Sequence, residues 1–183
     1  MSGPTHRARK RFGQNFLSDV GIIQKIHSAI GARAEDHIVE IGPGQGALTD
    51  ALVKSAGRID LIELDRDLAA PLTERYQNLP HCRVHQQDAL NTDFSELADG
   101  APLRVVGNLP YNISTPLIFH LLKYRSHIRD MHFMLQREVV ERLAASPGGG
   151  QWGRLGIMTQ LFCEVDGLFD VPPEAFNPRP KVM

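Results

Sequence analysis

Short apolar segments alternate with helix-like segments along most of this chain, and that alternation constrains the fold more than any other feature. The apolar segments, which have the length and composition of buried strands, are residues 37–41, 58–63, 83–86, 103–106 and 131–135. Helical patterns occupy residues 19–30, 47–56, 67–77, 116–124, 137–145 and 155–163. Strands that alternate with helices pair in parallel. The sequence therefore predicts an α/β fold, with a mostly parallel central sheet flanked by helices.

Composition restricts the class of protein further. The chain has 183 residues, of which 42% are hydrophobic and 22% charged, as expected for one globular domain with its own core. Cys82 and Cys163 form no CxxC pair, and the eight histidines lack metal-ligand spacing. We therefore expect no disulfide framework and no metal. No apolar run approaches the roughly 20 residues that span a bilayer, so we expect a soluble, cytoplasmic monomer that does not bind a membrane.

Charge is distributed unevenly along the chain. Acids outnumber bases between residues 35 and 100, and bases outnumber acids in the rest. Two basic clusters stand out: Arg7, Arg9, Lys10 and Arg11 at the head, and Lys123, Arg125, Arg129, Arg137 and Arg142 later. Such clusters suit phosphate contacts, although a run of charge is more often a solvated face. Charge alone therefore does not establish RNA binding.

A glycine-rich segment follows the first predicted strand. Gly42, Gly44 and Gly46 alternate in the segment 40–46, where the chain turns from strand to helix. Glycine lets a backbone approach a ligand closely, and parallel sheets bind ligands at the carboxyl ends of their strands. The G-x-G-x-G spacing differs from the G-x-G-x-x-G of dinucleotide sites. We expect a nucleoside-like cofactor here, although the pattern also fits a tight turn.

Two acidic residues stand at the ends of the next predicted strands. Glu63 ends the second strand, about twenty residues after the glycines, where a carboxylate can accept both hydroxyls of a ribose. Asp88 is placed at the end of the third strand, where it could accept a hydrogen bond from an adenine amine. Either acid alone could be a solvated cap. Their order along the chain favours a cofactor site.

The turn Asn108-Leu109-Pro110-Tyr111 follows the fourth predicted strand. The lone pair of an aryl amine is delocalised, so the amine must be held where a methyl group can reach it. An asparagine oxygen and a carbonyl held rigid by proline can accept its two N–H bonds. A neighbouring tyrosine offers a face on which a base can stack. An ordinary strand-to-turn junction has a similar composition.

With these motifs in order, the chain resembles the ribosomal RNA adenine N6,N6-dimethyltransferases, a branch of the S-adenosylmethionine-dependent class I methyltransferases with a Rossmann-like fold. The resemblance covers essentially the whole chain. It is carried by the segments 9–17, 40–49, 87–89, 108–116 and 176–182, together with Glu63. The resemblance implies S-adenosylmethionine as cofactor and ribosomal RNA as substrate.

The resemblance also implies roles for particular residues. The cofactor residues it implies are Asn15, Leu17, Gly42, Gly44, Glu63, Asp88 and Asn108. Glu63 would hold the ribose, Asp88 the adenine amine, and Gly42 would lie under the methionine part. The residues implied on the substrate side are Asn108, Leu109, Pro110, Tyr111 and Phe176. Asn108 and the Leu109 carbonyl would accept the target N6 amine, and Tyr111 and Phe176 would sandwich a flipped adenine.

Two branches of this family differ in substrate. Leu109 and the continuation 114–117 resemble the branch that dimethylates two adjacent adenosines near the 3′ end of small-subunit (16S) ribosomal RNA. The partners would then be the small subunit and its RNA. Alternatives are a large-subunit adenine methyltransferase that confers macrolide resistance, and a non-catalytic assembly factor. An NAD-dependent oxidoreductase is disfavoured by the glycine spacing.

The expected domain organisation is one catalytic domain over residues 1–183, with a basic segment at 1–18. Members of the family usually continue with a small helical domain beyond the motif at 176–182. We therefore expect that the chain is truncated before that domain.

Overall fold

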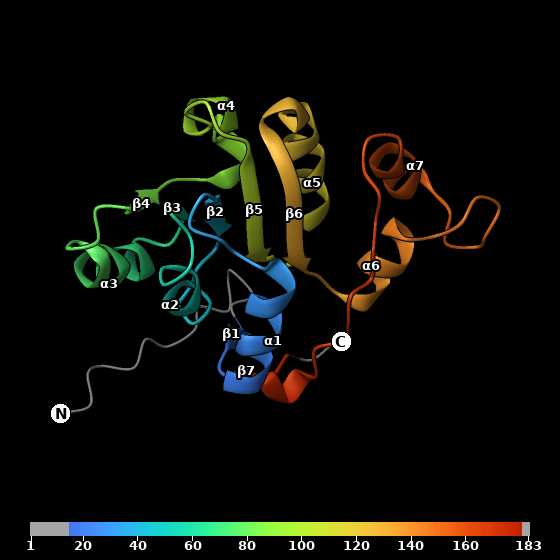
Figure 1. Cartoon of the computed structure of the whole chain (residues 1–183). Coiled ribbons are helices and arrows are strands. Elements are labelled where there is room, and N and C mark those ends of the chain that lie inside the picture. Colours follow the sequence, from blue (N-terminus) through green and yellow to red (C-terminus); the bar gives the residue numbers. More distant parts are fainter. Residues whose placement is uncertain (1–14, 181–183) are drawn as a thin grey trace.

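A computed structural model describes residues 15–180 and contains a five-stranded parallel sheet (Figure 1). Its strands are β2 (His37–Ile41), β3 (Arg58–Glu63), β4 (Cys82–Gln86), β5 (Leu103–Asn108) and β6 (Ile128–Met134). The order across the sheet is β4-β3-β2-β5-β6, and every neighbouring pair is parallel. The predicted α/β class is confirmed. The chain runs outward from β2 to β4 and then resumes at β5 on the other side of β2, so the winding reverses between β2 and β5.

Helices cover both faces of the sheet. The α-helices are α1 (Val20–Ile30), α2 (Thr49–Leu52), α3 (Arg66–Tyr76), α4 (Phe94–Leu97), α5 (Ser114–Lys123), α6 (Arg137–Leu143) and α7 (Arg154–Gln160). Short 3₁₀ helices lie at η2 (Ala89–Asn91), η3 (Arg125–His127) and η4 (Pro173–Ala175). In Figure 1, α3 lies beside β4 at one edge of the sheet, and α6 and α7 lie beyond β6 at the other.

Alternation along each strand fills two core layers. In β2, Ile38 points into the layer built with α1, α2 and α3, whereas its neighbour Val39 points into the layer built with α4 and α5. Both side chains are fully buried. A third cluster, which includes Leu122 and Leu155, joins α5, α6 and α7. Since burial of a large aliphatic side chain contributes about 1.5–3 kcal/mol, these layers hold the helices against the sheet and fix the strand ends.

The predicted helix over 19–30 is confirmed, together with both of its caps. The Asp19 carboxylate accepts from the Ile22 N–H at 2.9 Å, and Gly31 ends the helix in the left-handed conformation with φ of 57°. The last carbonyls are bound by the buried guanidinium of Arg104, whose Nη2 donates to the Ile30 oxygen at 2.6 Å. Arg104 also pairs with Asp36 at 2.7 Å and with Asp130 at 2.9 Å. One side chain of β5 thus anchors α1 to the amino-terminal edge of the sheet.

A second buried polar group lies within the sheet. Asp60 of β3 is fully buried and accepts from His37 of β2 and His85 of β4, each at 2.6 Å. Burial acts to raise the pKa of Asp60, but the hydrogen bonds from the two histidines hold it well below its usual range. These contacts tie three adjacent strands through side chains as well as through the backbone ladder.

A two-stranded sheet that was not predicted joins the two ends of the described chain. Strand β1 (Phe16–Leu17) pairs antiparallel with β7 (Phe176–Asn177), and Leu17 lies opposite Phe176. The Ser18 N–H donates to the Ala175 carbonyl at 2.8 Å, which continues the connection toward α1. Figure 1 shows β1 and β7 beside α1. Strands of two residues are too short to leave a periodic pattern, so nothing in the sequence pointed to this pairing.

Several predicted boundaries need correction. The prediction of a helix over 47–56 is wrong at both ends, because α2 spans Thr49–Leu52 and is flanked by turns. Strand β5 extends through Asn108, two residues beyond its prediction, because Leu109 continues the pairing by donating to the Met134 carbonyl at 3.1 Å. Residues 146–153, which contain three consecutive glycines, lie outside regular helices and strands.

Candidate active site

The loop after β2 is built on three glycines with left-handed backbones. Gly42, Gly44 and Gly46 have φ of 65°, 59° and 82°, conformations that side chains rarely adopt. The Gly42 N–H donates to the Ile62 carbonyl at 2.9 Å, and the Gly46 N–H donates to the Pro43 carbonyl at 2.9 Å. The glycine loop, residues 42–46, is therefore held against the end of β3 and leads into α2 with a fixed shape.

Gly44 meets two other parts of the site. Its N–H donates to Glu63 Oε2 at 3.2 Å. A Cβ on Gly44 would lie 3.0 Å from Cδ1 of Phe16, closer than packing permits without movement of the ring. Glycine is therefore required here both by φ and by the approach of β1. Phe16 is a contributor to the site that the sequence analysis did not single out.

Glu63 ends β3 as predicted. It is 6% exposed, and its Oε1 accepts from the Asp65 N–H at 2.9 Å while its Oε2 accepts from Gly44. Burial raises the pKa of Glu63, although the hydrogen bonds from these backbone amides act in the opposite direction. A carboxylate has about four acceptor positions. Acceptor capacity therefore remains for further donors, such as the hydroxyls of a ribose.

Asp88 lies at the same edge but does not end a strand. Strand β4 stops at Gln86, and Asp88 caps η2, with Oδ1 accepting from the Leu90 N–H at 2.9 Å and Oδ2 from the Asn91 side chain at 3.1 Å. The preceding Gln87 N–H donates to the Glu63 carbonyl at 3.1 Å. Asp88 is thus held by a cap two residues beyond the end of β4, and it retains acceptor capacity on both oxygens.

Asn108 ends β5 beside the glycine loop. A Cβ on Gly42 would lie 3.9 Å from the Asn108 carbonyl oxygen. The Asn108 Nδ2 donates to the Asn15 carbonyl at 3.3 Å, which orients the amide and leaves Oδ1 without a donor among the described residues. Leu109 is buried, and the next carbonyl, that of Pro110, accepts from Ile113 and Ser114.

Tyr111 and Phe176 differ in their surroundings. The Tyr111 ring is 66% exposed on the turn that leads into α5. Phe176 is partly buried against the core layer of α1, α2 and α3, and it is placed near the site by its pairing with Leu17. Within residues 15–180, no ring contact joins Tyr111 to Phe176. The structure therefore brings Asn15, Leu17, the glycine loop, Glu63 and Asn108 together, with Tyr111 at the margin.

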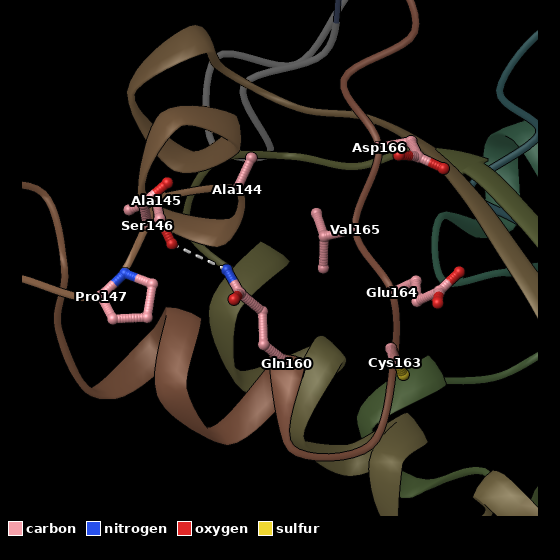
Figure 2. Close-up of a pocket in the computed structure, with 9 residues that line it drawn as sticks. All are labelled: Ala144, Ala145, Ser146, Pro147, Gln160, Cys163, Glu164, Val165 and Asp166. Carbon is pink, nitrogen blue, oxygen red and sulfur yellow. Dashed lines mark hydrogen bonds between the residues drawn. The ribbon is translucent and has the colours of Figure 1, made fainter. Parts of the chain in front are cut away.

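Two cavities lie elsewhere. One, of about 400 Å³, lies between α6, α7 and the segment after α7 (Figure 2), where Gln160 donates to the Ala145 carbonyl at 3.0 Å. The other, of about 430 Å³, is lined by residues of β3, β4 and α4 such as Arg83 and Glu96. Neither contains the glycine loop or Asn108.

Between residues 15 and 180, no three His, Cys, Asp or Glu side chains gather as ligands for a metal ion. Every helix in the same range falls short of the length and apolarity needed to cross a bilayer.

The later basic cluster does not form one free cationic face. Arg129 pairs with Asp36 at 3.1 Å and Arg137 with Asp170 at 2.8 Å, while the Arg125 guanidinium stacks on the ring of Phe162 at 4.6 Å. These arginines hold parts of the fold together. The basic residues at 7–11 lie outside the described residues.

These features are those of the class I methyltransferase fold. They are a glycine loop after one parallel strand, an acid at the end of the next, and an Asn-Leu-Pro-Tyr turn across the switch in winding. A dimethyladenosine transferase from Plasmodium falciparum superposes with a TM-score of 0.81 at 34% identity, over 91% of this chain and 60% of that one. The 23S rRNA methyltransferase ErmE gives a TM-score of 0.75 at 27% identity, over 92% of this chain and 66% of that one.

The sequence profile described as ribosomal RNA adenine dimethylase matches residues 5–183, so the chain belongs to that family. Curated relatives carry the name ribosomal RNA small subunit methyltransferase A. One from Pseudomonas savastanoi pv. phaseolicola is 64% identical over 178 residues, 97% of this chain and 66% of its own length. Another from Chromohalobacter salexigens is 60% identical over 184 residues, 98% of this chain and 65% of its own length. The chain thus spans about two thirds of the relatives it matches.

Proposed function

We propose that this chain is the catalytic domain of an enzyme that transfers methyl groups from S-adenosylmethionine to adenine N6 in small-subunit (16S) ribosomal RNA. The products would be two adjacent N6,N6-dimethyladenosines near the 3′ end of that RNA. Membership of the adenine dimethylase family and the names of the relatives at 60–64% identity support this reading.

The observation that carries the proposal is the meeting of the glycine loop and Asn108 at the switch in winding between β2 and β5. Parallel sheets bind ligands at such a point, because the two loops diverge there and leave room between them. The loop after β2 offers close backbone approach, and Asn108 offers an amide oxygen on the other side. A methyl donor and an amine acceptor would therefore meet at this point.

The residues present fit the proposed cofactor. Glu63 has acceptor capacity for a ribose diol, Asp88 can accept from an adenine amine, and the absence of Cβ atoms at Gly42 and Gly44 leaves space beside the loop. The Asn15 carbonyl accepts from Asn108, and Leu17 follows it in β1. When bound, S-adenosylmethionine supplies a methyl group already activated by its sulfonium. The protein therefore needs neither a metal nor a strong base.

On the substrate side, the task of the protein is to position the amine. The Asn108 Oδ1 and the Leu109 carbonyl would accept the two N6 hydrogens, with Pro110 fixing the turn. Tyr111 and Phe176 would stack on the extruded base, which offsets the cost of unstacking it from RNA. Well-oriented reactants gain on the order of 7–11 kcal/mol from proximity. The proton leaves to water after attack.

The proposal extends to partners and location. The substrate would be the small ribosomal subunit, which places the protein in the cytoplasm, and one monomer suffices for the reaction. Residues 1–183 would form a single catalytic domain, with the rest of the length found in the relatives contributing to RNA docking.

The test is to incubate unmethylated small subunits with labelled S-adenosylmethionine and map the product by mass spectrometry. We expect N6,N6-dimethyladenosine at two adjacent positions near the 3′ end. Label confined to large-subunit RNA would identify the other branch of the family. RNA binding without any label would identify a non-catalytic assembly factor. Calorimetry with S-adenosylmethionine and NAD should give a signal for the first ligand alone.

A further inference from the structure

Glu40 is a buried carboxylate directly behind the glycine loop. It lies in β2 and is 3% exposed. Its Oε2 accepts from the Thr49 hydroxyl at 2.7 Å, and Thr49 is itself fully buried at the start of α2. The pair therefore bridges the two elements that the glycine loop connects.

The surroundings of Glu40 are acidic. Asp50 of α2 and Glu63 of β3 act on it as like charges, and the Cys82 thiol faces it from β4. Arg75 of α3 pairs with Asp50 at 3.5 Å and donates to the Gln45 carbonyl. Within residues 15–180, Glu40 has no ion-pair partner. Buried carboxylates without a cation are costly in the ionised form.

These surroundings have a consequence for protonation. Burial raises the pKa of Glu40 to about 7, with Asp50 and Glu63 acting in the same direction and the Thr49 hydrogen bond against it. The same burial and the charge of Glu40 raise the pKa of Cys82 to about 11. Near neutral pH, a nearby positive charge would therefore decide whether Glu40 carries a proton.

The hydrogen bond from Thr49 links the protonation state of Glu40 to the glycine loop. The Asp50 N–H donates to the Gly46 carbonyl at 2.9 Å, and the Tyr76 hydroxyl donates to Asp50 at 2.7 Å. Thr49 thus belongs to the rigid turn that ends the glycine loop. A hydroxyl donates more strongly to a carboxylate than to a neutral carboxyl group, so ionised Glu40 holds this turn more firmly.

We propose that Glu40 is a proton-linked positioning residue: it is neutral in part of the population before the methyl donor binds, and a cation at the glycine loop converts it to the carboxylate that anchors Thr49. The released proton passes to solvent. This inference rests on the proposed function, because S-adenosylmethionine brings a sulfonium charge to the loop. S-adenosylhomocysteine lacks that charge and would release fewer protons.

The sign of the pH dependence follows directly. A cation favours ionised Glu40, and the ionised form is more abundant at higher pH. The affinity for S-adenosylmethionine relative to S-adenosylhomocysteine should therefore rise between pH 6 and pH 8. If the bound sulfonium lowers the pKa of Glu40 by one unit, the ratio of the two affinities changes by up to about tenfold.

Calorimetry of the 183-residue chain in buffers of different ionisation enthalpy measures the protons released as each ligand binds. We expect more protons to be released by S-adenosylmethionine than by S-adenosylhomocysteine near pH 7. Glu40→Gln keeps the shape and an acceptor for Thr49 but cannot titrate, so it should remove the difference. Glu35→Gln is the matched control, because Glu35 is exposed on the surface, and it should behave as wild type.

A second pair of variants tests the link through Thr49. Thr49→Val keeps the volume but removes the donor that lowers the pKa of Glu40, so the proton-release profile should move to higher pH. Thr49→Ser keeps the hydroxyl and should restore the wild-type profile. A purely structural role for Thr49 would alter affinity without moving this profile, and that outcome would overturn the link.

The remaining outcomes separate the inference from the proposed function. Equal proton release with the two ligands would overturn the role of Glu40 while leaving methyl transfer intact. A difference in proton release that survives Glu40→Gln would assign the proton to Glu63 and would also overturn the role of Glu40. A chain that binds neither ligand at any pH would overturn the proposed function and this inference together.

Discussion

The backbone N–H of Gly44 donates to the Glu63 carboxylate across 3.2 Å, so the loop after β2 and the end of β3 form one unit. The second carboxylate oxygen is held by the Asp65 N–H at 2.9 Å. Two backbone amides thus fix the carboxylate on its protein side and leave its outer acceptor positions to a ligand. This arrangement explains how Glu63, which follows the glycine loop by about twenty residues, comes to lie against that loop.

Removal of the Glu63 carboxylate should weaken cofactor binding. Hydrogen bonds to a charged group contribute about 1.5–3 kcal/mol, so we expect Glu63→Ala to lower the affinity for S-adenosylmethionine by roughly 10- to 150-fold in calorimetry. Glu74→Ala, at an exposed position of α3, is the control and should leave the affinity unchanged. Equal affinities of the two variants for S-adenosylmethionine would show that Glu63 does not hold the ribose.

A substitution at Gly44 separates backbone strain from loss of the site. Gly44→Ala and Gly100→Ala both force an alanine into a left-handed backbone, at a cost of about 1–2 kcal/mol each. Gly100 has nothing within 4 Å of an added Cβ, whereas Gly44 has the Phe16 ring at 3.0 Å. Urea denaturation should show a larger loss for Gly44→Ala, and that variant alone should lose cofactor affinity. If the two variants lost cofactor affinity to a similar extent, the contact between Phe16 and the glycine loop would not matter for cofactor binding.

Arg104 should be a large contributor to stability. Its guanidinium is 5% exposed and binds Asp36, Asp130 and the Ile30 carbonyl. Arg104→Met leaves the buried Asp36 carboxylate and the partly exposed Asp130 without this partner. Removing one member of a buried ion pair typically costs about 3–5 kcal/mol in the free energy of unfolding. Arg129→Met removes a half-exposed partner of the same Asp36 and should cost no more than about 1 kcal/mol. Urea denaturation of both variants checks the difference, and equal values would refute this account.

Much of this fold could be predicted because the strands carry their own signal. Residues 37–41 and 58–63 are buried on both faces of the sheet and are rich in isoleucine, leucine and valine, so both strands were predicted with their correct ends. Asp19 and Gly31 marked the ends of α1 in the same local way. By contrast, α2 was predicted too long, because the glycine loop uses the apolar residues at 47 and 48 in a turn.

The parts of the site that depend on distant contacts could not be predicted in the same way. The pairing of Leu17 with Phe176 joins residues at opposite ends of the chain, and the hydrogen bond from Asn108 to Asn15 depends on that pairing. Asp88 was placed on a strand end because the cap of η2 lies only two residues farther on. The family resemblance named these residues as a group, but the contacts that place them became visible only in the fold.

Tyr111 should affect the RNA substrate and not the cofactor. Its ring is exposed on the turn after Asn108. Base stacking on an aromatic side chain is worth about 1–3 kcal/mol, so Tyr111→Ala should raise the KM for ribosomal subunits by roughly 5- to 150-fold. Tyr111→Phe keeps the ring and should stay close to wild type. If the two variants behaved alike in steady-state assays, stacking at this position would be excluded.

Asn108→Ala tests whether the end of β5 is where the methyl group meets adenine. The variant should keep its affinity for S-adenosylmethionine within about fivefold, the cost of one neutral hydrogen bond. Its single-turnover rate of methyl transfer to unmethylated small subunits should fall by at least about a hundredfold, because the amine is no longer positioned. Methyl transfer at the wild-type rate would contradict the account.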